Sequence, residues 1–87
     1  MPVYVDNAKI LHRGSPRNHM SADSLAELHA FAAEIGVKKC WYHRGTAHPH
    51  YDITDIQREQ ALNSGATAVD SRFLLKIAKR LAAPTIP

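Results

Sequence analysis

The sequence predicts a small α/β domain in which three short strands alternate with three helices. Three runs with strand character, at residues 3–5, 37–43 and 66–69, are each followed by helical apolar spacing or a helix cap further along the chain. Strands that alternate with helices are usually parallel and joined by right-handed crossovers. We therefore expect a small three-stranded parallel sheet in the order β-α-β-α-β-α.

Composition indicates one globular domain with a mild positive charge. The 87 residues allow a single domain, residues 1–87, with 1–2 and 83–87 at its periphery. Eleven Lys and Arg against eight Asp and Glu favour anionic partners. Cys40 is the only cysteine and lies in an apolar run, which predicts a buried thiol and a reducing, cytoplasmic compartment. No window approaches the roughly 18 apolar residues of a membrane helix, so we expect no membrane partner.

The N-terminal part predicts a strand and then a long loop. Val3–Val5 is rich in β-forming residues, and Asp6 ends the run. Between residues 7 and 20 no periodicity is visible, and long loops of small domains are often functional. The expected loop carries cations and imidazoles, namely Lys9, His12, Arg13, Arg17 and His19.

The first helix is expected at residues 23–35. Ser24 and Glu27 have the spacing of a capping box, and Gly36 gives a C-terminal stop. One apolar stripe follows from the spacing of Leu25, Leu28, Ala32 and Ile35. Residues 37–43 then predict a second strand. Gly45 and Pro49 mark the following stretch, up to Asp52, as a turn-rich loop.

The C-terminal part predicts helix, strand and helix. Thr54 and Gln57 form another capping box, so a second helix is expected at residues 55–63, with a weak apolar face. Residues 66–69 predict the third strand. A last helix begins after Asp70 and ends before Pro84.

The predicted topology brings the chemically rich loops to one edge of the sheet. Strand-to-helix loops of a parallel sheet emerge at its carboxyl edge, where ligands of open α/β sheets bind. Helices that begin there also direct their positive N-terminal ends at an anion. The expected ligand-binding residues are Asp6, Arg13, Arg17, His19, Arg44, His50, Tyr51 and Asp52.

Several motifs resemble a known family of small bacterial and phage proteins that is described only as a domain of unknown function. They include the start at Val3, the run Ala22-Asp23-Ser24-Leu25 and the run Pro49-His50-Tyr51-Asp52. The resemblance covers nearly the whole chain. Residues of the family pattern that stand here at corresponding places are His19, Asp23, Glu27, His29, Trp41, His50, Tyr51 and Asp52. It implies a bacterial or phage origin and supplies no activity.

The leading functional hypothesis is a binding module for an anionic small molecule, a nucleotide or similar phosphate-bearing ligand. Arginines can grip phosphates, and Tyr51 or Trp41 can stack on a base. A phage protein that sequesters a host nucleotide signal would have such a site. This function requires no cofactor.

An alternative is a small phosphoesterase or nuclease in which His19 and His50 act as catalytic general acid and base. The spacing of His48, His50 and Asp52 also resembles a metal-binding motif. A divalent metal held by His50 and Asp52, with His19 as a further ligand, is therefore possible.

A third hypothesis is a protein-binding adaptor that uses the basic last helix. No recognised nucleic-acid-binding motif is present, which argues against sequence-specific DNA recognition. Because the expected core is small, we also predict a homo-oligomer, most simply a two-fold dimer.

Overall fold

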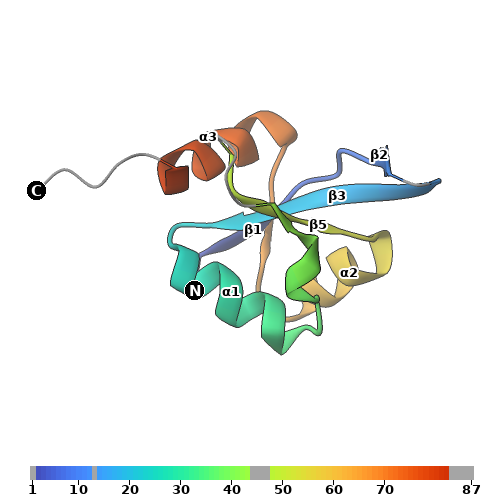
Figure 1. Cartoon of the computed structure of the whole chain (residues 1–87), viewed down its shortest axis with the longest axis horizontal. Helices are drawn as coiled ribbons and strands as arrows, with labels where there is room; N and C mark the ends of the chain where they lie inside the picture. Colours follow the sequence, from blue (N-terminus) through green and yellow to red (C-terminus); the bar gives the residue numbers. More distant parts are fainter. Residues whose placement is uncertain (1, 13, 44–47, 83–87) are drawn as a thin grey trace, which may run out of the picture.

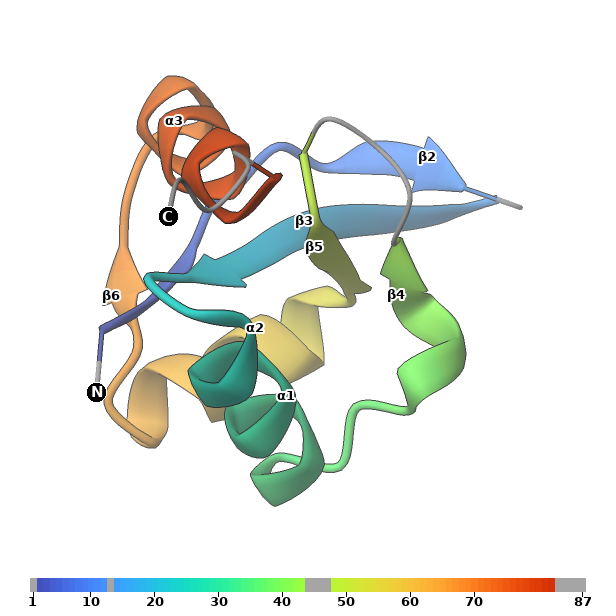
Figure 2. The ribbon, with the colours of Figure 1, turned by 60° about the vertical axis from the view of Figure 1, so that its left-hand side comes forward.

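The computed structural model describes residues 2–12, 14–43 and 48–82, apart from the side chains of His12 and His43. A mixed sheet forms its centre, with strand order β4-β5-β3-β1-β6, and β2 pairs with β3 (Figures 1 and 2). The strands are β1 (Val3–Val5), β2 (Ile10–His12), β3 (Ser15–Ala22), β4 (Tyr42–His43), β5 (His50–Ile53) and β6 (Thr67–Ala68).

This sheet corrects the predicted three-stranded parallel sheet, although the α/β class itself is confirmed. Among the described strands, β1 and β6 pair in parallel, whereas β3 pairs antiparallel with β1, β2 and β5, and β4 pairs antiparallel with β5. The chain therefore opens with three strands in succession and does not alternate strictly between strand and helix.

The central strand β3 lies inside the segment that we predicted to be a loop. It follows a turn at Gly14, whose φ of +79° suits glycine. Its alternation is concealed because a polar residue, Asn18, occupies a fully buried position. The Asn18 side chain accepts a hydrogen bond from the Lys9 amide (3.1 Å) and donates one to the Asp55 carboxylate (2.9 Å). A buried amide with both groups satisfied is tolerated in a strand, but an apolar-polar pattern does not reveal it.

The strand predicted at residues 37–43 is mostly a different element. Lys39–Trp41 forms a 3₁₀ turn, η1, and only Tyr42–His43 pairs as β4. The prediction of a buried Cys40 thiol is wrong, because this side chain is exposed on η1. The predicted loop up to Asp52 likewise ends early, since β5 begins at His50.

The three helices confirm the predictions based on caps and periodicity. They are α1 (Leu25–Glu34), α2 (Asp55–Asn63) and α3 (Ser71–Ala82). Ser24 accepts a hydrogen bond from the Glu27 amide, and Thr54 and Gln57 form a complete capping box. These interactions are local, which is why the sequence alone predicts them.

The helices cover opposite faces of the sheet. Figures 1 and 2 show α1 and α2 on one side and α3 on the other. The main core lies under α1 and α2 and consists of Val3, Val5, Met20, Ala22, Leu28, Phe31, Ala32, Val37, Tyr51, Ile53, Ala61 and Ala66. On its own side, α3 buries Leu74, Ile77 and Ala78. Within the described ranges, no helix has the length and apolar character that crossing a bilayer requires.

Candidate functional site

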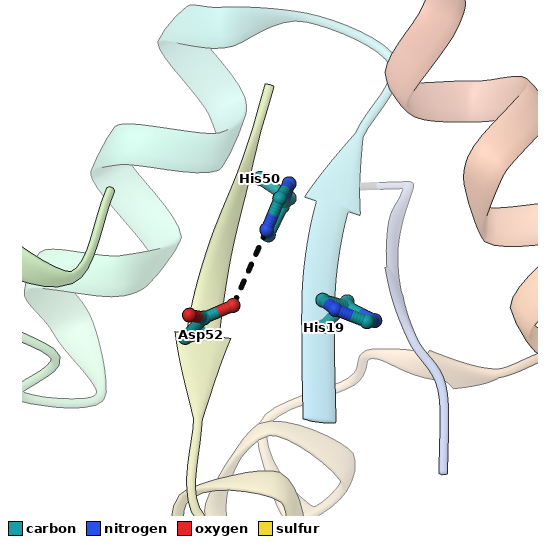
Figure 3. A group of neighbouring side chains, drawn as sticks. All are labelled: His19, His50 and Asp52. Atoms are coloured by element: carbon teal, nitrogen blue, oxygen red, sulfur yellow. Dashed lines mark ion pairs between the residues drawn. The ribbon is translucent and has the colours of Figure 1, made fainter. Parts of the chain in front are cut away.

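Strand pairing brings three polar side chains together on the face beneath α3. His19 of β3 lies directly opposite Asp52 of β5 in the antiparallel register. Residues two apart in a strand share a face, so His50 is on the same side as Asp52. Figure 3 shows the three side chains over these two strands. The rings of His19 and His50 meet edge to face, with centroids 4.8 Å apart and an interplanar angle of 90°.

His19 is held by Asp6, the residue that follows β1. The His19 Nδ1 lies 2.8 Å from Asp6 Oδ2, and the His19 backbone amide donates to Asp6 Oδ1 at 2.7 Å. The Ala8 amide also donates to Oδ1 at 3.3 Å. Asp6 is fully buried. The carboxylate therefore fixes both the backbone and the ring of His19.

This pairing shifts the titration of both groups. The hydrogen bond to Asp6 raises the pKa of His19 above its ordinary value; burial opposes the shift, and the charges of Asp6 and Asp52 add to it. Burial alone would raise the pKa of Asp6, but the hydrogen bonds from the His19 ring and amide outweigh it and lower that pKa. The pair therefore favours a carboxylate next to a cationic imidazole.

His50 is oriented by its own chain and contacts Asp52. Its Nδ1 hydrogen-bonds to the His48 carbonyl oxygen. A carbonyl can only accept, so Nδ1 carries the proton. The other ring nitrogen, Nε2, lies 3.2 Å from Asp52 Oδ1. One nitrogen from each of the two histidines and one oxygen of Asp52 lie within 4.8 Å of one another. Such a group of two imidazoles and a carboxylate is able to bind a metal ion.

A pocket of about 330 Å³ lies over this group. Its walls combine imidazoles from the sheet side with mostly apolar side chains of α3. The lining residues are His19, His48, His50, Ser71, Leu74, Leu75 and Ala78. A ligand in this pocket would meet both histidines and aliphatic side chains of α3.

The family model described as "Protein of unknown function (DUF4031)" matches residues 3–81. The chain belongs to this family. The sequence resemblance to a domain of unknown function is thereby confirmed. No curated protein and no solved structure matches the chain.

Four of the predicted site residues are adjacent in the structure. Asp6, His19, His50 and Asp52 form one chain of contacts from β1 across β3 to β5. They lie on strands and at a strand end, whereas we expected most of them in loops at a sheet edge. These residues were predicted from the chemistry of their side chains, and the antiparallel pairing of the strands brings them together.

Tyr51 is not brought to this group. It is 2% exposed and faces the main core, where its hydroxyl lies 2.7 Å from His29 Nδ1. Successive residues of a strand point to opposite faces, so the neighbours of Tyr51 in sequence are on the other side of the sheet. His29 of α1 is partly buried, and its hydrogen-bond partner is the Tyr51 hydroxyl.

Of the predicted arginines, only Arg17 lies within the described residues. Its guanidinium carbon is 4.0 Å from the centroid of the Trp41 ring, a cation–π contact. Arg17 is two residues before His19 in β3 and so on the same face, but it does not line the pocket. Arg13 and Arg44 lie outside the described residues.

The apolar wall of the pocket was not predicted as part of a site. Leu74, Leu75 and Ala78 line the pocket but were not among the predicted site residues. The amphipathic spacing of α3 indicates that this helix packs against the sheet, but no sequence pattern states which face of the sheet a helix covers.

Proposed function

We propose that this protein binds a small phosphate-bearing ligand, of nucleotide class, in the pocket between α3 and the sheet. The supporting observation is that His19 and His50 line a pocket whose other lining is mainly aliphatic. Pockets of small-molecule sites typically combine apolar walls with a few polar groups that orient the ligand.

The histidines of the pocket suit an anion. Asp6 favours the cationic form of His19 by raising its pKa, so the ring can offer a charged N–H to a phosphate near neutral pH. Ser71 adds a hydroxyl at the first residue of α3, where backbone amides and the helix dipole also favour negative charge. The formal net charge of +3 favours the same partner.

The aliphatic side chains of α3 suit the flat, weakly polar part of such a ligand. Leu74, Leu75 and Ala78 project from one side of α3 at helical spacing. A volume of about 330 Å³ is at the lower end for ligand pockets, which favours mononucleotides over dinucleotides. Tyr51 takes no part in this proposal, because it lies in the core.

Calorimetry with metal-free protein tests the proposal. A panel of mono-, di- and cyclic nucleotides is titrated, with inorganic phosphate and the free nucleosides as matched ligands. We expect a mononucleotide to bind more tightly than either phosphate or nucleoside alone, because the pocket contacts both parts. The proposal fails if no nucleotide gives heat at micromolar protein.

A phosphoesterase is the second candidate, and the pairing of Asp6 with His19 favours it. A carboxylate that fixes the Nδ1 proton of a histidine leaves Nε2 to exchange protons with a substrate. His50, whose ring contacts His19 edge to face, would provide the second acid-base group. A divalent metal at His19, His50 and Asp52 would add Lewis-acid assistance.

Incubation of the same nucleotide panel, followed by chromatography, separates the two candidates. Products that form with the purified protein and not with His50→Asn indicate an enzyme. Recovery of intact ligand that binds in calorimetry indicates a binding protein.

Two further properties belong to this proposal. A cytoplasmic location suits a chain whose only cysteine is a free thiol.

Self-association would cover exposed apolar side chains on β2, where Ile10 is 56% and Leu11 73% exposed. Light scattering that gives a monomer at about 100 μM would contradict the dimer.

A further inference from the structure

We propose that His19, His50 and Asp52 bind one divalent transition-metal ion, for which zinc is the best fit, with Asp6 as a residue that positions His19. This inference depends on the side-chain geometry and not on the proposed nucleotide ligand. Two imidazoles and a carboxylate are a ligand set that zinc accepts readily.

Both imidazoles are oriented by a hydrogen bond of Nδ1, so Nε2 of each ring is the nitrogen that would coordinate a metal. His19 Nδ1 contacts the Asp6 carboxylate at 2.8 Å, and His50 Nδ1 donates to the His48 carbonyl. Histidines that bind metals typically donate their other ring N–H to a carboxylate or a backbone carbonyl, which fixes the tautomer and the ring orientation. Here His19 pairs with a carboxylate and His50 with a backbone carbonyl, and Nε2 is the coordinating nitrogen of both.

His50 and Asp52 already have the spacing of two ligands of one metal ion. His50 Nε2 lies 3.2 Å from Asp52 Oδ1. Ligand atoms around a tetrahedral zinc are about 3.3 Å apart. The observed spacing already matches that separation.

His19 completes the group with little movement. One ring nitrogen of each histidine and one oxygen of Asp52 lie within 4.8 Å of one another, so closure requires a shift of roughly 1.5 Å. The His19 side chain is 22% exposed and borders the pocket, which leaves room for a small rotation. Three protein ligands leave a fourth coordination position, and the pocket over His19 and His50 is where an external ligand would take it.

Asp6 is the least exposed member of the arrangement. It accepts hydrogen bonds from the His19 ring, the His19 amide and the Ala8 amide, so its carboxylate has a fixed position. Removal of its charge would weaken the Nδ1 hydrogen bond and allow the ring to turn. Such supporting residues are typically worth about 10- to 100-fold in metal affinity.

Zinc titration of chelator-treated protein, in the absence of any nucleotide, tests the site. We expect one ion per chain with micromolar or tighter affinity. His50→Asn and Asp52→Asn should each weaken it by about tenfold or more, and Asp6→Asn by about 10- to 100-fold. His29→Gln is the matched control, because this histidine lies on the other face of the sheet, and it should leave zinc affinity unchanged.

Two spectroscopic measurements add readouts that a purely structural role would not move. Cobalt in place of zinc should give visible absorption bands of a four- or five-coordinate site, and Asp52→Asn should alter them. Long-range ¹H–¹⁵N spectra should show His19 and His50 as Nδ1–H tautomers with zinc on Nε2. Melting curves with a chelator present establish that each variant is folded.

Two results would overturn the proposal. One is the absence of zinc binding up to about 1 mM zinc. A dissociation constant of that size corresponds to a binding free energy near −4 kcal/mol. The other is an unchanged zinc affinity in both His50→Asn and Asp52→Asn, measured on variants that are folded. Because no nucleotide is present, either result leaves the ligand-binding proposal to its own calorimetric test.

Discussion

The two faces of the central sheet bury different kinds of side chain. Under α1 and α2 the strands contribute Val3, Met20 and Ile53, which pack without exposed area. Under α3 the same strands contribute His19 and Asp52, next to a pocket of about 330 Å³. Stability of this small domain therefore resides mainly on one face, and the other can carry a site whose groups are not packed to full density.

Each face also treats a histidine differently. On the core face, burial first and the charge of Lys39 second lower the pKa of His29. On the site face, the hydrogen bond to Asp6 raises the pKa of His19. The core thus favours a neutral ring and the site favours a charged one. The local partners of each imidazole, and not the residue type, determine the direction in which its pKa shifts.

Neighbouring residues of β5 provide the strongest test of this contrast. Ile53→Ala removes a fully buried side chain and should lower the free energy of unfolding by roughly 2–5 kcal/mol. Asp52→Asn, on the other face, should cost about 1 kcal/mol, because it removes a charge-assisted contact without leaving a cavity. Urea unfolding monitored by circular dichroism measures both.

Ile53→Val is the milder companion variant if Ile53→Ala does not fold, with an expected loss of about 0.5–1.5 kcal/mol. Equal losses for Asp52→Asn and Ile53→Ala would contradict the division of roles between the faces.

The same contrast explains what the sequence could predict. Helices α1, α2 and α3 depend on caps and spacings within a few residues, and their positions follow from Ser24, Thr54 and Asp70. Strand β3 depends on partners far along the chain. Its buried Asn18 is satisfied only because Lys9 and Asp55 come close in the fold. Short-range patterns carry no information about such contacts.

The candidate site was predictable in its chemistry but not in its geometry. His19, His50 and Asp52 stand out by residue type, and the structure places them together. Tyr51 was included because it is their neighbour in sequence, yet alternation along β5 directs it to the core. Whether a strand residue belongs to a site depends on the face of the sheet to which its side chain points. That face is known only when the pairing partners of the strand are known.

His50→Asn is the second test, and it concerns the site face. The Asn side chain can keep a hydrogen bond to a nearby carbonyl, so the free energy of unfolding should fall by only about 1 kcal/mol. Nucleotide affinity should fall by roughly tenfold to a thousandfold, since one strong contact is lost. Calorimetry and thermal melting on the same preparation check this. A large loss of stability with affinity intact would exclude this face as the site.

Tyr51→Phe is the third test, and it concerns the core face. The substitution removes the hydroxyl that lies 2.7 Å from His29 Nδ1 but keeps the packed ring. We expect a loss of about 1 kcal/mol in the free energy of unfolding and unchanged nucleotide affinity. Urea unfolding and calorimetry measure the two quantities. A marked loss of affinity in a stable variant would show that Tyr51 takes part in binding after all.

The smallest expected effect is the pH dependence that His29 gives to stability. Its pKa is lowered in the folded protein, while the unfolded chain has a value near 6.5. Between these two values the unfolded chain binds more protons, so stability should fall as the pH decreases below about 6.5 and level off below the folded pKa. His29→Gln lacks this term, and other groups titrate alike in both proteins. The difference in melting temperature between wild type and His29→Gln, measured from pH 7.5 to pH 5, should therefore shift steadily in favour of the variant as the pH falls. Parallel curves would show that the core face does not hold His29 in its neutral form.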